Sequence, residues 1–95
     1  MPHVSFTQHL LRFFPTLAEA EIPGATVREV IDELDRRHPG LGAFIVDETG
    51  RLRRHVNIFV GDEPIADRDR LADKLSPGDR VFIVQALSGG GSSGG

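Results

Sequence analysis

The stretch RVFIVQALSGGGSSGG, residues 80–95, joins two very different kinds of sequence. Residues 81–87 are apolar, β-branched and aromatic without Pro or Gly, apart from one Gln, and they predict a β-strand. From Ser88 onward no side chain is larger than a hydroxymethyl group, so the segment buries too little apolar surface to offset its ordering entropy. We therefore expect a last strand that leads straight into a flexible tail, whose diglycine carboxylate can enter a narrow site on another protein.

The composition narrows the class of protein. A chain of 95 residues is the size of one small domain. It has no Cys, which excludes disulfides, thiolate zinc sites and a nucleophilic thiol, and which suits the reducing cytoplasm. No apolar run has membrane-spanning length, the start MPHVS lacks a secretory pattern, and the net charge of −3 argues against nucleic acid. We expect a cytoplasmic protein that binds neither membranes nor nucleic acid.

The first third of the chain predicts a hairpin followed by a helix. Strands are expected over residues 3–9 and 17–22, joined by an apolar turn that Pro15 interrupts. The helix is expected over residues 26–37, because Thr26 can cap it and Glu29 has the capping-box spacing. Four apolar residues with helical spacing form one stripe that should pack on a sheet: Val27, Val30, Ile31 and Leu34.

The remainder predicts short elements around two strands. Residues 41–46 are either one helical turn or an extended connector, and residues 51–60 predict a strand. Ile65 is expected in a short strand or its remnant, and residues 71–75 in a short helical turn. The sequence thus predicts an α+β fold: a mixed sheet of four to five strands with one long helix across one face.

Three stretches in this order carry a resemblance to a known family: ATVREVIDEL at 25–34, HVNIFVGDEPI at 55–65 and LSPGDRVFIVQALSGG at 75–90. Together they resemble the ubiquitin-like β-grasp proteins and, among them, the MoaD/ThiS family of sulfur carriers. The second stretch is most similar to the MoaD-type, CysO-like branch. The resemblance covers about residues 3–90 and implies a β-grasp domain over 1–88 with a Gly/Ser tail over 89–95.

The resemblance also implies a function. An E1-like adenylating enzyme of the MoeB/ThiF type would use ATP to activate the C-terminal glycine, and a sulfur donor or persulfide protein would convert it to a thiocarboxylate. A sulfur-acceptor enzyme would then use that sulfur for cofactor, cysteine or thiolated-tRNA synthesis. The chain itself would bind no cofactor and would not be an enzyme. Two alternatives stay open: a ubiquitin-like modifier joined to target lysines, and an interaction module with an inert tail.

The sequence contains two candidate reactive ends. By its distance from the last strand, the family's diglycine corresponds to Gly89 and Gly90, but the printed sequence continues to a second pair, Gly94 and Gly95. Five extended residues add about 17 Å of reach, so one partner tunnel could not hold both ends alike. Residues 91–95 are therefore removed by a processing peptidase, or are the native working end, or are a cloning addition.

A candidate docking face follows from the alternation of the strands. If Val81 and Ile83 point into the core, then Phe59, Phe82 and Val84 point outward, and grouped exposed aromatics mark partner surfaces. The resemblance implies the same face, and it implies that Leu87 and Ser88 lead into the partner's tunnel. The alternative is a one-residue shift of register that would place both Phe side chains beneath the helix.

Two further groups of residues are weaker candidates. The four histidines have no metal-ligand spacing, so no metal site is expected: His3, His9, His38 and His55. Four arginines form either a basic patch for an acidic partner or a solvated strand face: Arg12, Arg51, Arg53 and Arg54. The charged residues at 62–63 and 67–70 are expected to be solvated loop charges.

Overall fold

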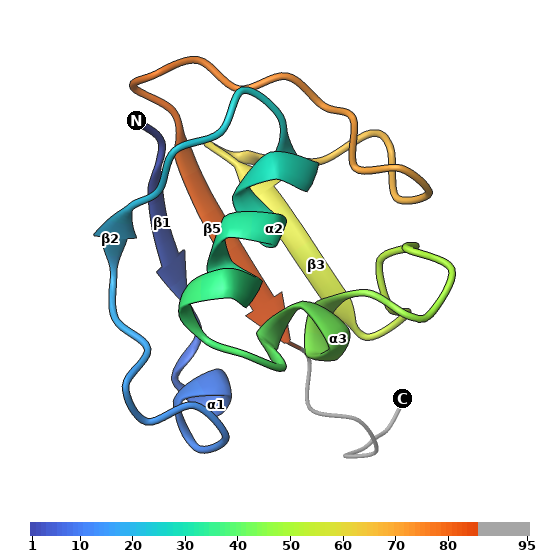
Figure 1. The fold of residues 1–95 in the computed structure, drawn as a ribbon. Coiled ribbons are helices and arrows are strands. Elements are labelled where there is room, and N and C mark those ends of the chain that lie inside the picture. Colours follow the sequence, from blue (N-terminus) through green and yellow to red (C-terminus); the bar gives the residue numbers. More distant parts are fainter. Residues whose placement is uncertain (86–95) are drawn as a thin grey trace.

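The computed structural model describes residues 1–85, which form one five-stranded sheet and three helices. The strands are His3–Phe6 (β1), Ala20–Glu21 (β2), Val56–Val60 (β3), Glu63–Pro64 (β4) and Arg80–Gln85 (β5). The helices are Gln8–Leu11 (α1), Val27–Arg37 (α2) and Leu41–Ile45 (α3). Helix α2 lies across one face of the sheet (Figure 1), so the expected α+β architecture is confirmed. None of these helices has the length and apolar character that a membrane span needs.

The first and last strands lie together at the centre of the sheet. The strand order is β2-β1-β5-β3-β4. Strand β5 runs parallel to β1, with Val4 opposite Val81, and antiparallel to β3, with Ile58 opposite Ile83. The sheet is therefore mixed, and β5 ends between two neighbouring strands rather than at an exposed edge.

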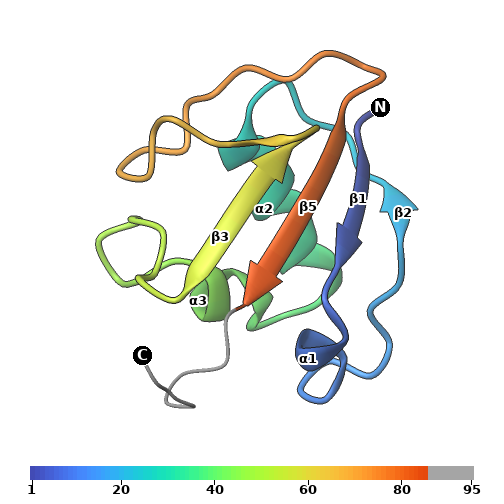
Figure 2. The same ribbon diagram turned by 180° about the vertical axis from the view of Figure 1, so that it is seen from behind.

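The core lies between α2 and the inner face of the sheet. The predicted stripe of α2 is confirmed, since each of its members is at most 1% exposed: Val27, Val30, Ile31 and Leu34. Val4, Ile58, Val81 and Ile83 belong to the same buried cluster from the sheet. Burial of each such side chain stabilises the fold by roughly 1.5–3 kcal/mol. The view from behind shows the other face of the sheet without a helix over it (Figure 2).

Helix α2 begins and ends where the sequence predicts. The Thr26 Oγ1 accepts a hydrogen bond from the Glu29 N–H at 3.2 Å. The Glu29 carboxylate accepts a hydrogen bond from the Ala25 N–H at 2.8 Å. In the usual capping box this bond comes from the N–H of the N-cap residue, here Thr26, so the donor is shifted by one residue. At the other end, Gly40 has φ +98°, a left-handed conformation that favours glycine just beyond a helix.

The predicted strands of the first hairpin are too long. Strand β1 ends at Phe6 rather than His9, because the chain turns at Thr7 into α1 and thereby buries Leu10. Strand β2 pairs with β1 over two residues only, although Leu17 and Ile22, which flank it, are both buried. Local packing of apolar side chains therefore replaces regular strand pairing in this region.

The region after α2 resolves one alternative and corrects one strand. Residues 41–46 form the helical turn α3, not an extended connector. Strand β3 begins at Val56 rather than Arg51. The carbonyls of Arg53 and Val56 accept hydrogen bonds from the Arg68 side chain, and Leu52 forms an isolated bridge with Val46. Polar contacts with a distant loop thus determine where the strand starts.

The segment between β3 and β5 differs most from expectation. The short strand lies at Glu63–Pro64, one residue before the predicted Ile65, whose N–H still donates to the Ile58 carbonyl at 2.9 Å. The predicted helical turn over 71–75 is wrong. Leu71 has φ +58°, and the carboxylates of Asp67 and Asp73 accept the backbone N–H groups of this loop. These side-chain acceptors satisfy the backbone without a helix.

Candidate docking face

Strand β5 separates its side chains cleanly between two environments. Val81 and Ile83 are completely buried, whereas Phe82 is 40% exposed and Val84 is partly exposed on the opposite face. The expected orientation of β5 is confirmed, and the register shift that would have covered Phe82 with the helix is excluded. The burial of Val81 and Ile83 therefore decides between the two orientations that the sequence left open.

Neighbouring strands extend the exposed row of β5 across the sheet. Phe82 lies opposite Phe59 of β3 and opposite Ser5 of β1, and Val84 lies opposite Asn57. Directly opposed residues of paired strands share a face, so these five side chains form one surface, which we call the outer sheet face. No helix among residues 1–85 covers this face (Figure 2), and its centre is apolar and aromatic.

The last described residue of β5 is held on both sides. The Gln85 N–H donates to the Thr7 hydroxyl at 3.4 Å, and Gln85 lies opposite Val56 in the β3–β5 register. The Thr7 N–H donates in turn to the Ile83 carbonyl at 3.2 Å. The chain therefore leaves the sheet from a fixed point. Beyond that point, outside the described residues, lie the candidates Leu87, Ser88, Gly89, Gly90, Gly94 and Gly95, and their roles stay predictions.

A second feature, not predicted in this form, lies at the start of β3. A hollow of about 620 Å³, which we call the basic groove, is lined mainly by basic side chains: Asp47, Arg51, Leu52, Arg53, Arg54, His55, Asn57 and Arg68. Three of the four arginines expected in a basic patch line it, but Arg12 does not. Arg68 takes part although its loop was expected to be merely solvated. Residues 67–70 alternate between Asp and Arg, a pattern that does not indicate a strand or helix face. Only the tertiary structure therefore identifies Arg68 as part of the groove.

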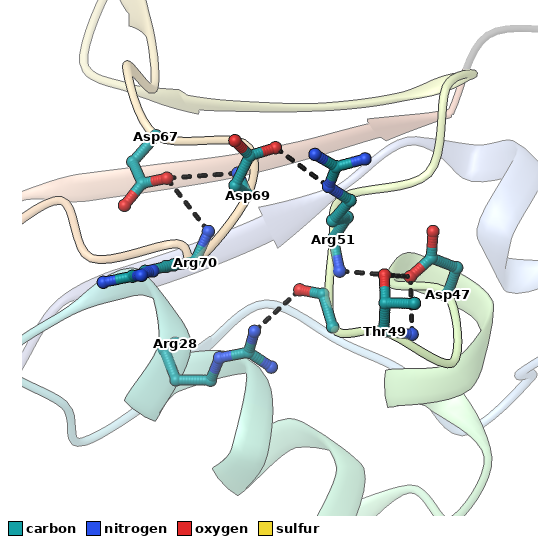
Figure 3. A network of polar contacts seen from close by, with 8 residues as sticks. Arg28, Asp47, Thr49, Arg51, Asp67, Asp69 and Arg70 are labelled. Atoms are coloured by element: carbon teal, nitrogen blue, oxygen red, sulfur yellow. Dashed lines mark hydrogen bonds and ion pairs between the residues drawn. The ribbon is translucent and has the colours of Figure 1, made fainter.

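Polar contacts hold the walls of the basic groove in place (Figure 3). The Arg51 Nε lies 3.1 Å from the Asp69 carboxylate, and the Arg28 Nη2 donates to the Gly50 carbonyl at 2.7 Å. The Thr49 hydroxyl donates to the Asp47 carboxylate and, with backbone N–H groups, lowers the pKa of Asp47. The network joins residues 47–51 to residues 67–70 and to α2, so the groove is part of the folded domain.

The histidines do not converge. His3 pairs with Glu19 at 3.0 Å, His9 stacks edge-on against Phe13, and His55 lines the basic groove. Within residues 1–85, no cluster of three or more His, Asp or Glu side chains could hold a metal ion.

Comparison with known proteins gives a consistent set of matches. The sequence profile of the ThiS family matches residues 11–90. The sulfur carrier protein CysO of Mycobacterium tuberculosis is 36% identical over 69 residues, which is 70% of this chain and 74% of that protein. Small archaeal modifier protein 3 of Haloferax volcanii is 28% identical over 89 residues, which is 84% of this chain and 96% of that protein.

Solved structures agree with these matches. A chain of the Amycolatopsis orientalis BexX/CysO complex aligns with a TM-score of 0.80 at 32% sequence identity, over 95% of this chain and all of that chain. Mycobacterium tuberculosis CysO aligns with a TM-score of 0.78 at 29% identity, over 92% of this chain and all of its own. The expected ubiquitin-like β-grasp fold is confirmed.

Proposed function

Because the chain belongs to the ThiS family, we propose that it is a sulfur carrier that is activated by a partner and catalyses nothing itself. Its reactive carboxyl group belongs to Gly90, with Gly89 giving access; Gly95 with Gly94 is the alternative. An E1-like adenylating enzyme consumes the ATP, a sulfur donor or persulfide protein supplies sulfur, and an acceptor enzyme receives it. The similarity to proteins named CysO supports cysteine synthesis as the pathway.

One observation supports this proposal most strongly. Strand β5 carries Phe82 and Val84 on the uncovered outer sheet face and ends at Gln85, five residues before Gly90. Five extended residues reach about 17 Å. A partner that binds the outer sheet face can therefore receive the terminal glycine in a site close to that face.

The chemistry needs little from the chain beyond its carboxylate. A carboxylate oxygen attacks the α-phosphorus of ATP and pyrophosphate leaves, which gives an acyl-adenylate. A persulfide sulfur then attacks the carbonyl carbon and AMP leaves. A thiol of the donor cleaves the remaining S–S bond, so that the glycine keeps a thiocarboxylate and the donor keeps a disulfide. Glycine favours the attack on the carbonyl carbon because it has no Cβ to crowd it.

A second candidate function is protein modification. The similarity to small archaeal modifier protein 3 extends over 84% of this chain and favours it. Activation would be identical, but a lysine amine rather than sulfur would attack the activated carbonyl. A C-terminal remnant of this chain on lysines of other proteins, found in digests of whole cells, would support this function. Trypsin cuts after Arg80, so the remnant of a chain ending at Gly90 would be VFIVQALSGG.

The proposal is tested by mass spectrometry of the intact chain after incubation with ATP, an E1-like enzyme from the same organism and a persulfide donor. We expect a species in which one oxygen is replaced by sulfur. A chain ending at Gly90 should react and a chain ending at Leu87 should not, whereas reaction of the 95-residue chain alone would assign the end to Gly95. If none of the chains forms an adenylate or a sulfur-bearing species, the proposal is wrong.

A further inference from the structure

The charge of the basic groove is not balanced from within. Among residues 1–85, Arg51 is the only arginine of the groove with a carboxylate at salt-bridge distance, namely Asp69. Arg53 and Arg68 donate to backbone carbonyls and the Asn57 side chain, which orient them. Arg53 also contributes to the lowered pKa of Asp47, but no ion pair joins the two side chains. Asp47, the acidic residue of the lining, already accepts hydrogen bonds from Thr49 and from the Arg51 backbone.

Arg54 and His55 are the exposed residues of this lining that differ from Arg51, which is also exposed but pairs with Asp69. Both side chains are exposed, and neither has a hydrogen bond or ion pair within the described part of the chain. Folding has already ordered the side chains of Arg53 and Arg68, so a ligand loses little additional side-chain entropy when it binds them. It meets a pre-oriented positive surface with two free donor groups at its rim. A groove whose lining is mainly positive attracts negatively charged groups.

An apolar hollow continues the groove. A second hollow of about 240 Å³ shares Arg53 and His55 with the groove and adds Ala43 and Phe44 of α3. A simple anion would use only the guanidinium groups. A peptide segment with carboxylates followed by an apolar side chain fits both hollows, and the chain's net charge of −3 does not suit a nucleic acid.

The groove lies at the end of the sheet from which the tail departs. It adjoins the first residue of β3, Val56, which pairs with Gln85 at the end of β5. Figures 1 and 2 both show the end of β5 close to the start of β3 and to α3. A protein that receives the tail therefore passes close to the groove.

We propose that the basic groove, with Arg54 and His55 at its rim, binds an acidic segment of the enzyme that adenylates the tail, beside the contact made by the outer sheet face. This inference rests on the proposed function and adds to it the charge of the partner's surface. The groove orients the carrier and speeds the encounter, because charges at the rim of an interface act mainly on the association rate.

The test compares Arg54→Glu, alone and with His55→Glu, with the matched control Lys74→Glu. Lys74 is exposed and pairs with Thr26 beside the start of α2, remote from the groove, and its reversal changes the net charge by the same amount as Arg54→Glu alone. ATP–pyrophosphate exchange by an E1-like enzyme from the same organism gives KM for each carrier. We expect Arg54→Glu to raise KM about fivefold at about 50 mM salt, with little change in kcat, and the effect to fade at about 500 mM.

The outcomes separate this inference from the proposed function. Normal exchange by the wild type together with equal KM values for Arg54→Glu and Lys74→Glu would refute the proposed binding role of the groove. The proposed function as a sulfur carrier would be unaffected. If millimolar inorganic phosphate abolishes the difference between the two variants at constant ionic strength, the groove is a phosphate site and the inference is wrong. Absence of exchange by the wild type would remove the proposed function and this inference with it.

Discussion

The two faces of the sheet use the same strands for opposite purposes. On the inner face, Val81 and Ile83 are sealed beneath α2, while on the outer sheet face Phe82 and Phe59 remain accessible to a partner. Adjacent residues of β5 therefore differ in what their loss should affect. An inner-face substitution should act on the free energy of unfolding, and an outer-face substitution should act on partner affinity.

The largest effect is expected from Ile83→Ala. The substitution leaves a cavity between β5 and α2, and such changes lower the free energy of unfolding by about 2–5 kcal/mol. Urea unfolding followed by far-ultraviolet circular dichroism measures it, since the chain has neither Trp nor Tyr for fluorescence. The control Ile83→Val should cost only about 0.5–1.5 kcal/mol. Equal midpoints for wild type and Ile83→Ala would contradict the assignment of this face to the core.

A smaller effect, on binding rather than stability, is expected from Phe82→Ala. Loss of a central interface aromatic costs about 2 kcal/mol or more, so KM for adenylation should rise about thirtyfold. The urea midpoint should move little, because the side chain is already 40% exposed. Phe82→Leu keeps most of the apolar area and should retain most of the affinity. An Ala variant that unfolds early but binds normally would reverse the roles of the two faces.

The smallest effect is expected on the solvent side of α2, away from both faces of the sheet. Arg36 and Arg37 hydrogen-bond the Glu33 carboxylate and lower its pKa from 4.5 to about 2. Because the pKa is lowered in the folded state, ionised Glu33 stabilises the fold above pH 4.5. This stabilisation is lost as the pH falls towards 2. Glu33→Gln should therefore be slightly less stable than wild type at pH 7, and the difference should shrink between pH 4.5 and 2. Urea midpoints at pH 7, 4 and 3 measure it; a difference that grows with acid would refute this assignment.

The parts of the fold that the sequence predicted well are those with a long regular pattern. Helix α2 has four apolar residues at helical spacing and a cap at Thr26, and β5 is a run of β-branched and aromatic residues. The helix was therefore predicted correctly, as was the last strand over the described residues 81–85, while the burial of Val81 and Ile83 decided which face of that strand points inward. The outer sheet face followed from the alternation of side chains along that strand.

The remaining parts depend on contacts between distant residues. Strand β2 has two residues and α1 has four, which is too short for a period to be recognised. The loop before β5 is shaped by the Asp67 and Asp73 carboxylates, and the start of β3 by Arg68, a residue of that same loop. The basic groove was missed as a unit for the same reason, because its guanidinium groups come from two segments that only the fold brings together.

The parallel pairing of β1 with β5 links recognition to the completeness of folding. The centre of the sheet combines the first and the last of the described strands, so the sheet is complete only when both ends of the described chain are in place. Contacts between such distant segments cost more loop-closure entropy than local contacts and therefore form slowly. A nascent or damaged copy lacks the aligned Phe59 and Phe82 at the same time as it lacks a core. The activating partner would thus adenylate only folded copies of the chain.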